Sequence, residues 1–244
     1  MSLPAALIFD VFGTLVDWRS GVAAEARRFF DRKGIDVDPF DFADQWRGEY
    51  QPTMERVRSG GRNYVPLDEL HRENLDIVLD RFHLSHHFSE AEKAAFNRAW
   101  EKLPPWPDTV PGLARLKERF IIAPCSNGSI ALMSRLAKFG ALPWDAILGA
   151  DIARNYKPRP EVYEASCAAL QLAPAETVMV AAHPSDLDAA KTCGLKTAFI
   201  PRPLEYGPAS QNDPKADQIV GMERRGDWDY LAADVENLDE ILIA

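Results

Sequence analysis

Four short polar segments follow apolar runs in this chain, and their side chains could together perform nucleophilic catalysis. In chain order, these segments contain Asp10, Ser126 with Asn127, Lys157, and Asp186. A carboxylate such as Asp10 can attack an electrophilic carbon when a nearby lysine keeps it ionised. Two unit charges ~4 Å apart interact by about 4 kcal/mol at an effective dielectric constant of ~20, so two carboxylates and an anionic substrate need cations between them. Lys157 and Arg47 are the cations that we expect at such a site.

The first of these carboxylates lies in the stretch Leu7 to Trp18, which reads LIFDVFGTLVDW. Its apolar start is typical of a strand buried on both faces of a parallel sheet, and Asp10 ends that run. Gly13 permits a sharp turn, and Thr14 adds a hydroxyl group near the carboxylate. Ligands of open α/β sheets bind at the carboxyl ends of the strands, so we expect Asp10 to face a crevice. Taken alone, Asp10 could merely cap a turn, but three further polar segments of the same kind favour a functional site.

The order of the predicted elements indicates how these segments come together. From Val110 onward strands alternate with helices, which is typical of βαβ units and a parallel sheet. Besides the strand before Asp10, we expect strands at residues 120–123, 146–148, 177–181 and 196–200, with a short edge strand near Ile219 or Asp234. Residues 204–217 contain Pro, Gly, Ser and Asn without periodicity, and they predict a surface loop.

Residues 18–103 have a helical pattern without a convincing strand, and they interrupt the sheet after its first strand. We expect one helix that Gly34 stops, one over 42–58 that Pro52 should kink or break, one over 67–82, and one over 89–103 that begins with a capping box of Ser89 and Glu92. The proline-rich residues 103–107 would return the chain to the sheet. The sequence therefore predicts an α/β fold: a doubly wound parallel sheet formed by residues 1–17 and 104–244, covered by a helical cap domain of residues 18–103.

Composition and charge argue against several classes of protein. The chain has 244 residues, and 46% hydrophobic against 27% charged residues indicates a globular protein. Its 28 Lys and Arg against 37 Asp and Glu give a net charge of -9 without a basic block, so we expect no nucleic acid partner. No apolar run reaches the ~20 residues of a membrane span, and the three cysteines lack metal-ligand spacing. We expect a soluble cytoplasmic protein that does not bind membranes.

The segment around the first carboxylate also resembles a known family. Residues Asp10 to Asp17, DVFGTLVD, resemble the first motif of the haloacid dehalogenase superfamily, in the variant that the L-2-haloacid dehalogenases carry. Phosphatases of this superfamily use Mg²⁺, an aspartate as general acid and a metal-binding aspartate, at positions that Phe12 and Ala182 occupy here. The resemblance covers nearly the whole chain. It implies a Rossmann-like core with a cap, and a hydrolase that removes halide from 2-haloacids without a metal or other cofactor.

The resemblance implies a role for each catalytic candidate. Asp10 would attack the carbon that bears the halogen and form an ester, while Thr14 would hydrogen-bond this carboxylate. Lys157 would neutralise the nucleophile, and Asp186 would help to activate the water that hydrolyses the ester. A halide leaves as an anion without a proton, so no further acid is required.

Further residues match those that bind the substrate and the halide in the family. The substrate-binding candidates are Ser126, Asn127, Tyr163 and the backbone N–H groups at Val11 and Phe12, and the halide-binding candidates are Arg47, Asn127 and His183. Arg47 follows Trp46, as in the family's Trp-Arg pair, whose arginine receives the departing halide. The implied partners are a small haloacid and its halide, and because members of the family often form dimers, a homodimer is compatible with the resemblance.

The fourth motif departs from the family pattern. The well-known L-2-haloacid enzymes carry Ser, Asn and Trp where this chain has Ala181, His183 and Ser185. His183 could donate a hydrogen bond to the departing halide, which matters most for fluoride, the smallest and most strongly hydrated halide. This interpretation predicts short substrates such as haloacetates, fluoroacetate included, besides (S)-2-haloacids. Alternatively, His183 packs under the loop and orients Asp186.

Each binding candidate also has a purely structural interpretation. Arg47 could be a solvated helix residue, Lys157 could lie on a surface turn before Pro158, and Tyr163 could belong to the core. The other histidines fall in the predicted cap without ligand-like neighbours and are expected at the surface: His71, His83, His86 and His87. Two other functions stay open, namely a phosphatase of the same superfamily and a non-catalytic ligand-binding or signalling module.

Overall fold

The described part of the chain contains one parallel sheet with the strand order β2-β1-β3-β4-β5. The structure is a computed structural model that describes residues 3–208 and 227–243. The strands are β1 (Ala6–Phe9), β2 (Ile121–Pro124), β3 (Thr177–Ala181), β4 (Lys196–Phe199) and β5 (Tyr230–Leu231). β1 pairs with β2 and β3 and is fully buried, as its unbroken apolar run predicts. The predicted α/β class with a parallel sheet is confirmed.

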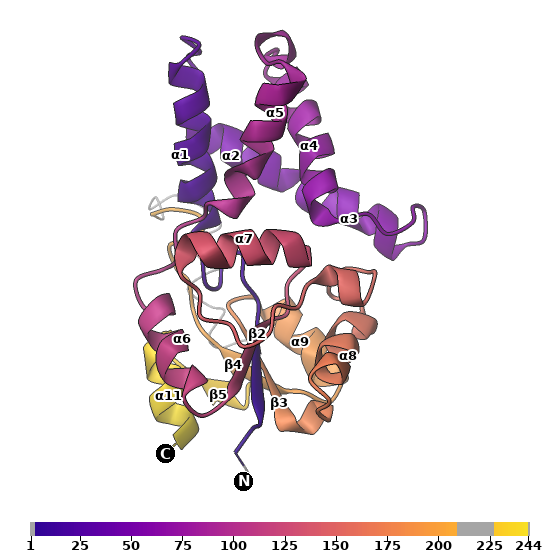
Figure 1. Cartoon of the computed structure of the whole chain (residues 1–244), viewed down its shortest axis with the longest axis vertical. Coiled ribbons are helices and arrows are strands. Elements are labelled where there is room, and N and C mark those ends of the chain that lie inside the picture. The colour runs from indigo at the N-terminus through magenta and orange to yellow at the C-terminus, as the bar shows by residue number, and fades with distance from the viewer. Residues whose placement is uncertain (1–2, 209–226, 244) are drawn as a thin grey trace.

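Helices cover both faces of the sheet, so the core is doubly wound (Figure 1). α6 (Thr109–Lys117) packs against α11 (Val235–Ile243) on one side. α8 (Pro160–Ala169) and α9 (Pro184–Thr192) pack together on the other side, where α9 contacts β3 and β4. α7 (Ile130–Gly140) crosses above the upper ends of the strands in this view.

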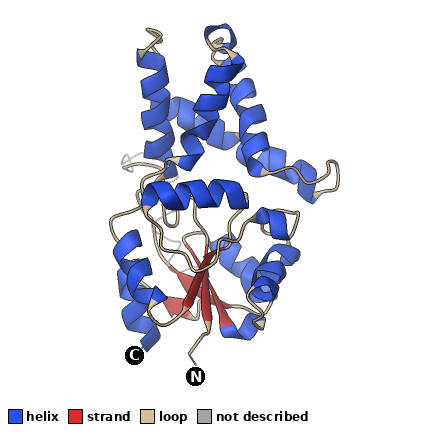
Figure 2. Cartoon of the chain, in the orientation of Figure 1, coloured by secondary structure: helices blue, strands red, loops and turns tan. Residues whose placement is uncertain are grey.

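A second helical layer lies beyond the carboxyl ends of the strands, and Figure 2 shows it as an all-helical half above the sheet. Its elements are α1 (Trp18–Asp31), α2 (Pro39–Gly48), α3 (Tyr50–Arg58), α4 (Leu67–Arg81), α5 (Glu90–Asn97) and a 3-10 turn at Arg98–Glu101. Aromatic rings fill its interior, where the centroid of Phe42 lies 5.1 Å from that of Phe30, 5.5 Å from Phe96 and 6.0 Å from Trp46. This layer stands where a cap is expected, and we refer to α1 to α5 as the cap.

The segment 146–148 is not a strand, so that prediction is wrong. Leu148 is buried in the core, which explains the apolar character of the segment. The hydrogen bonds to β2 come from Asp145 instead. Its amide donates to the carbonyl of Ile122 (3.0 Å), and its carboxylate accepts from the amide of Ile122 (3.0 Å). One residue thus satisfies polar groups at the edge of β2 that a further strand would have paired.

The first two predicted cap helices end or break at other residues than expected. α1 ends at Asp31, three residues before Gly34, which has a φ of +64°. Residues 42–58 form two helices that meet at Glu49. The predicted break is therefore present, shortly before Pro52, which lies in the first turn of α3 and has no N–H group to donate to the carbonyl of Gly48.

The other two cap helices agree better with the prediction. The predicted helix over 67–82 corresponds to α4. The predicted helix over 89–103 ends early, at Asn97, and passes into the 3-10 turn. Its capping box is confirmed, because Ser89 accepts from the amide of Glu92 while the carboxylate of Glu92 accepts from the amide of Ser89.

The described part of the predicted surface loop, residues 204–208, is not wholly at the surface. Glu205 is only 4% exposed, so the prediction is wrong for this residue. Arg202 explains the placement, because its Nε donates to the carbonyl of Thr14 (2.7 Å) and its other nitrogens bind both carboxylate oxygens of Asp108 (2.8 and 2.7 Å). This bidentate pair holds the segment against the core.

The predicted edge strand near Asp234 corresponds to β5, which lies slightly earlier in the chain. The alternative position, Ile219, lies outside the described residues. In the described ranges, no helix is long and apolar enough to cross a membrane.

Candidate active site

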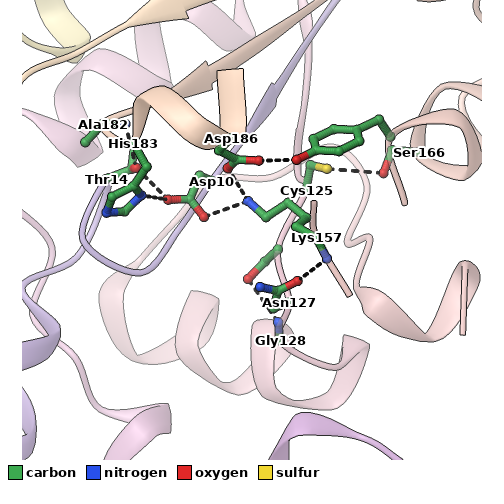
Figure 3. Close-up of polar contacts among 12 residues, drawn as sticks. Asp10, Thr14, Cys125, Asn127, Gly128, Lys157, Ser166, Ala182, His183 and Asp186 are labelled. Atoms are coloured by element: carbon green, nitrogen blue, oxygen red, sulfur yellow. Dashed lines mark hydrogen bonds and ion pairs between the residues drawn. The ribbon is translucent and has the colours of Figure 1, made fainter. Parts of the chain in front are cut away.

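Asp10 lies directly after β1, at the carboxyl edge of the sheet (Figure 3). Its amide donates to the carbonyl of Val180 in β3 (2.9 Å). The chain then turns at Gly13, whose φ of +88° favours glycine. This turn allows the hydroxyl of Thr14 to donate to Oδ2 of Asp10 (2.7 Å) while it accepts from the amide of Ala182 (2.9 Å). The backbone therefore fixes Thr14 as a donor to the carboxylate.

The ammonium group of Lys157 lies between two carboxylates, as Figure 3 shows. Its Nζ is 2.8 Å from Oδ1 of Asp10 and 2.5 Å from Oδ2 of Asp186. The exposed fractions of these three residues are 6%, 7% and 8%, so the charges have little water around them and depend on one another. Oδ1 of Asn127 accepts from the amide of Lys157 (2.7 Å), which fixes the segment that presents the lysine. The interpretation of Lys157 as a surface-turn residue is wrong.

These charges set the pKa values of the cluster. Burial would raise the pKa of Asp10, but the charge of Lys157 and the hydrogen bond from His183 outweigh it and hold this pKa far below its usual range. Burial would lower the pKa of Lys157, yet the two carboxylates raise it above its ordinary value. Burial and the negative charge of Asp10 outweigh Lys157 at Asp186, whose pKa is raised. Asp10 is therefore ionised at neutral pH, and Asp186 is the better proton acceptor of the two carboxylates.

Tyr163 supports Asp186 from behind. Its hydroxyl donates to Oδ1 of Asp186 (2.5 Å), and its side chain is fully buried in the core below the site. Burial and the charge of Asp186 raise the pKa of Tyr163, so the hydroxyl keeps its proton. Tyr163 does not line the cavity, so its predicted contact with substrate stays a prediction.

The residues expected to hold the substrate carboxylate lie on two loops beside Asp10. Val11 is fully buried, so the predicted contact of its backbone N–H group with a substrate stays a prediction. Phe12 lines the cavity next to Asp10. The hydroxyl of Ser126 accepts from the amide of Gly128 (3.1 Å), which leaves its hydrogen available to another acceptor.

The donor set does not fit a metal ion. Within residues 3–208 and 227–243, no group of three or more His, Cys, Asp or Glu side chains could hold one. Phe12 and Ala182 bring apolar side chains to the two positions where the phosphatase pattern requires carboxylates. The space between the carboxylates of Asp10 and Asp186 is taken by the ammonium group of Lys157.

Arg47 of α2 forms the opposite wall of the cavity. Its guanidinium carbon lies 3.9 Å from the ring centroid of Tyr50 and 5.3 Å from that of Trp18, in the range of cation–π contacts. Among the described residues, its buried Nη1 has no hydrogen-bond partner. A buried donor without a partner is costly, and an anion in the cavity could complete it. Arg47 is therefore not a solvated helix residue.

His183 lies between Asp10 and a carboxylate that the sequence did not reveal, that of Glu205. Its Nδ1 is 2.9 Å from Oδ2 of Asp10, and its Nε2 is 3.0 Å from Oε2 of Glu205. The hydrogen bonds of the ring go to these two residues and not to Asp186, whereas the carbonyl of His183 accepts from the amide of Asp186 (3.0 Å), so an orienting role toward Asp186 stays open for the backbone of His183 but not for its ring. A halide contact of His183 stays a prediction, and it would require one of these two bonds to break.

His71 is 1% exposed, so the prediction that it lies at the surface is wrong. Its ring stacks on Trp100 with a centroid distance of 4.1 Å, and its carbonyl accepts from the indole of Trp46 (3.0 Å). Neither ring nitrogen has a hydrogen-bond partner among the described residues. Burial and the charge of Arg47 lower the pKa of His71 well below its ordinary value, so the ring is neutral. The remaining cap histidines are exposed, as predicted: His83, His86 and His87.

A hydrogen bond from the cap reaches the backbone of Lys157. Nη1 of Arg58, at the end of α3, donates to the carbonyl of Lys157 (2.7 Å). A second hydrogen bond runs in the opposite direction, from Nη2 of Arg159 to the carbonyl of Arg58 (2.6 Å). These bonds tie α3 to the segment that presents the lysine.

The two walls enclose a cavity of about 180 Å³. This is small beside the roughly 300–1,000 Å³ of sites for drug-sized ligands. Asp10, Lys157 and Asp186 line its core side, and Arg47 and Tyr50 line its cap side. An ionised carboxylate that faces a cation with an unused donor suits a displacement in which the leaving group departs as an anion.

The parallel α/β sheet, the helical layer beyond it and the ionised carboxylate after the first strand agree with the hydrolase family that the sequence resembles. The chain matches the family model of the haloacid dehalogenase-like hydrolases over residues 4–194, and it belongs to that family. It is 30% identical over 236 residues to (S)-2-haloacid dehalogenase 4A of Burkholderia cepacia, which covers 94% of this chain and 96% of the relative. The solved structure of a defluorinating L-2-haloacid dehalogenase is 44% identical and superposes with a TM-score of 0.93, over 99% of this chain and 96% of that chain. A phosphoglycolate phosphatase of Cereibacter sphaeroides is also similar, at 29% identity over 209 residues, 83% of this chain and 87% of the relative.

Proposed function

We propose that the protein hydrolyses short 2-haloalkanoic acids to 2-hydroxy acids through an ester of Asp10. The observation that carries the proposal is the pairing, across one small cavity, of an ionised Asp10 with the unused Nη1 donor of Arg47. The similarity to (S)-2-haloacid dehalogenase 4A and to the defluorinating L-2-haloacid dehalogenase supports this substrate class.

In the first half reaction, an oxygen of Asp10 attacks the carbon that bears the halogen, and the halide leaves with the bonding electrons. The leaving halide needs no proton, so the reaction tolerates Phe12 where a phosphatase has its acid. Arg47 stabilises the negative charge that develops on the halide. The substrate carboxylate binds to the hydroxyl of Ser126 and to the backbone N–H groups at Val11 and Phe12.

In the second half reaction, water attacks Cγ of the esterified Asp10. Asp186 accepts a proton from this water, which its raised pKa favours. The bond between Cγ and the bridging oxygen then breaks, the 2-hydroxy acid takes the proton from Asp186, and the second proton of the water is released. Tyr163 and Lys157 each hold one oxygen of Asp186 and so keep it in place.

The size and charge of the cavity favour small substrates. A volume of about 180 Å³ suits acids of two or three carbons better than long chains. We extend the proposal to fluoroacetate, because the defluorinating dehalogenase is 44% identical to this chain. Fluoride departs with a high charge density, and the guanidinium group of Arg47 on the opposite wall would stabilise that charge.

A phosphatase activity is the second candidate, and the similarity to phosphoglycolate phosphatase favours it. The geometry around Phe12 and Ala182 opposes it, since no carboxylate is present at either position. Release of phosphate from phosphoglycolate in the presence of Mg²⁺, at a rate above that of halide release from chloroacetate, would replace the first proposal with the second.

A single-turnover reaction in ¹⁸O-labelled water tests the ester. With enzyme in excess over chloroacetate, we expect ¹⁸O in the side chain of Asp10 and unlabelled glycolate, because water attacks Cγ and the product keeps the original aspartate oxygen. Direct attack of water on the substrate would instead place the label in glycolate and leave Asp10 unlabelled.

The substrate range is tested by halide release from fluoroacetate, chloroacetate, bromoacetate and both enantiomers of 2-chloropropionate. We expect turnover of the haloacetates and of the (S) enantiomer. Asp10→Asn serves as the negative control, and its turnover should fall by about 10⁴-fold or more because an amide cannot form the ester. Halide release by a folded Asp10→Asn preparation at the wild-type rate would contradict the proposal.

A further inference from the structure

Glu205 is held in the active site by several independent contacts. Its Oε1 accepts from the indole nitrogen of Trp18 (3.0 Å), and both of its oxygens lie within hydrogen-bond distance of Nε2 of His183 (3.2 and 3.0 Å). A Cβ atom at Gly13 would lie 2.2 Å from Oε1, so the glycine leaves the space that this carboxylate fills. The amide of Glu205 also donates to the carbonyl of Arg202 (3.0 Å), whose guanidinium is anchored to the core. These contacts make Glu205 part of the site and not of a surface loop.

The position of His183 between two carboxylates requires a proton on each ring nitrogen. A neutral imidazole has one N–H group, so it would turn a lone pair toward either Asp10 or Glu205. An ionised carboxylate only accepts hydrogen bonds, and a lone pair beside it would be repelled. Burial would lower the pKa of His183, but the charge of Glu205 and the hydrogen bond to Asp10 raise it well above its ordinary value. The ring is therefore an imidazolium in the free enzyme.

The two oxygens of Asp10 have different partners. Oδ2 accepts from the hydroxyl of Thr14 (2.7 Å) and from Nδ1 of His183 (2.9 Å). Among the described residues, Oδ1 accepts only from Nζ of Lys157 (2.8 Å). An oxygen with two directed donors resembles an oxyanion hole, because such donors stabilise a charge that grows on the oxygen. Oδ1, with one partner, keeps a lone pair for the substrate.

We propose that Glu205 is a positioning residue that holds His183 as an imidazolium, and that His183 and Thr14 together stabilise the oxyanion on Oδ2 of Asp10 during ester hydrolysis. This inference rests on the proposed dehalogenase function. It assigns Oδ1 as the attacking oxygen and Oδ2 as the carbonyl oxygen of the ester.

The electron movements balance in both steps. When Oδ1 forms its bond to carbon, the carbon–halogen bond breaks and the halide takes the electron pair. When water attacks Cγ and gives a proton to Asp186, the π pair of the carbonyl moves to Oδ2. The pair returns from Oδ2 as the bond between Cγ and Oδ1 breaks, and the product alkoxide takes the proton from Asp186. Esterification removes one of the two charges that face His183, so Glu205 alone then holds the ring charged.

The first half reaction depends on the halogen of the substrate, whereas the second does not. Fluoroacetate and chloroacetate give the same glycolyl ester on Asp10, because the halide has left before hydrolysis begins. A residue that serves hydrolysis must therefore affect both substrates equally in the second half reaction. A residue that donates to the halide must affect the first half reaction, and fluoroacetate more than chloroacetate.

The test is rapid-quench kinetics of Glu205→Gln with both substrates, with the ester on Asp10 followed by the mass of the intact protein. We expect ester formation to change by less than about 3-fold, while ester hydrolysis slows by about 10²-fold for both substrates, as for one lost transition-state donor. The ester should then accumulate, and halide should appear in a burst equal to the amount of enzyme. His183→Asn is the second variant and should also slow hydrolysis equally for the two substrates.

The pH profile of ester hydrolysis gives a second readout. Because Glu205 raises the pKa of His183, the wild-type donor stays charged well above pH 6.5, and in Glu205→Gln the alkaline limb of the hydrolysis rate should move to lower pH. Glu101→Gln is the matched control, since it removes another buried carboxylate, paired with Arg98 of the 3-10 turn and with Arg135 of α7. We expect this control to leave both half reactions and the pH profile unchanged.

The outcomes separate this inference from the function on which it rests. Equal slowing of both half reactions in Glu205→Gln, or unchanged hydrolysis with an unmoved alkaline limb, would overturn the role of Glu205. Slowing of fluoride release alone in His183→Asn would assign the ring to the halide instead of the oxyanion. If the wild type forms no ester on Asp10, the proposed function fails and the inference fails with it.

Discussion

On the core wall of the cavity each charged group has a partner of opposite sign, whereas on the cap wall Nη1 of Arg47 has no hydrogen-bond partner among the described residues. The two histidines next to these walls, His183 and His71, follow the same division. His183 lies between two carboxylates and is charged, while His71 lies among aromatic rings and is neutral. One residue type thus takes opposite protonation states a short distance apart, because the surrounding charges differ.

This difference gives each wall a separate task. The carboxylates of Asp10 and Asp186 share the ammonium group of Lys157, so this wall can hold an ionised nucleophile and does not attract another anion strongly. On the cap wall the guanidinium of Arg47 stacks on Tyr50 and keeps a donor without a partner among the described residues, so an anion is drawn to Arg47. A haloacid that places its halogen toward the cap leaves its electrophilic carbon toward Asp10.

Removal of Lys157, the cation of the core wall, should cause the largest loss of stability and activity. In Lys157→Met, Asp10 and Asp186 lose their shared partner, so we expect destabilisation by about 3–5 kcal/mol and a loss of turnover of about 10³-fold or more. The folded-state pKa of Asp10 is depressed in the wild type, so its contribution to stability is present above the unfolded pKa of 3.8 and is lost as pH falls through the folded value. In the variant this contribution disappears, and the acid limb of activity should move to higher pH.

Chemical denaturation and a pH–rate profile measure these effects. Lys117→Met is the matched control, because Lys117 pairs with Asp145 at the surface with 39% of its side chain exposed. We expect the control to behave as the wild type in both measurements. A Lys157→Met enzyme with an unshifted acid limb would contradict the assignment of the lysine as the group that keeps Asp10 ionised.

A smaller but clear loss should follow on the cap wall. Arg47→Lys keeps the positive charge but loses the planar group that stacks on Tyr50, so we expect turnover to fall by about 10²-fold with the fold and stability largely kept. Single-turnover halide release should show the loss in the first half reaction. Arg62→Lys, at an exposed pair with Glu73, is the control. Equal rates for Arg47→Lys and the wild type would remove Arg47 from the halide site.

The cap histidine should affect stability and not chemistry. Its depressed folded-state pKa means that the unfolded chain binds more protons, so His71 destabilises the protein as pH falls below about 6.5, its ordinary value. His71→Phe should remove this effect and the two buried nitrogens without partners, and we expect stability at pH 5 to rise by about 1 kcal/mol. Denaturation at pH 5 and pH 8 checks the difference. A lower stability of His71→Phe than of the wild type at pH 5 would contradict a neutral His71 ring in the folded protein.

The smallest expected effect is that of metal removal. Because Phe12 and Ala182 replace the carboxylates of the phosphatase pattern, we expect halide release to continue at the untreated rate after treatment with EDTA. Loss of activity in EDTA that Mg²⁺ restores would contradict a site in which Lys157 takes the place of a metal.

The parts of the fold that local pattern controls could be predicted from the sequence. β1 and β3 are uninterrupted apolar runs, and Asp10 and His183 follow these strands closely, so their convergence followed from a parallel sheet. The capping box at Ser89 also depends only on neighbours along the chain. The same reasoning failed for residues 146–148, because an apolar run reports burial but does not distinguish a strand from a buried loop.

The contacts that tertiary packing creates could not be predicted. Glu205 lies in a segment without periodicity, and its burial depends on Arg202, which binds Asp108 from a distant part of the chain. His71 was misplaced for a similar reason, since the ring that covers it, Trp100, follows a helix later. Gly13 leaves the space that the carboxylate of Glu205 fills. In the sequence, however, a sharp turn was already a sufficient reason for a glycine at this position.

The bond between Arg58 and the carbonyl of Lys157 has a consequence for the exchange of substrate and product. A movement of α3 away from the core must break this bond and the return contact from Arg159. Both bonds belong to the segment that places the ammonium group between its carboxylates. A movement of α3 would therefore be coupled to the position of the ammonium group that compensates the charge of Asp10.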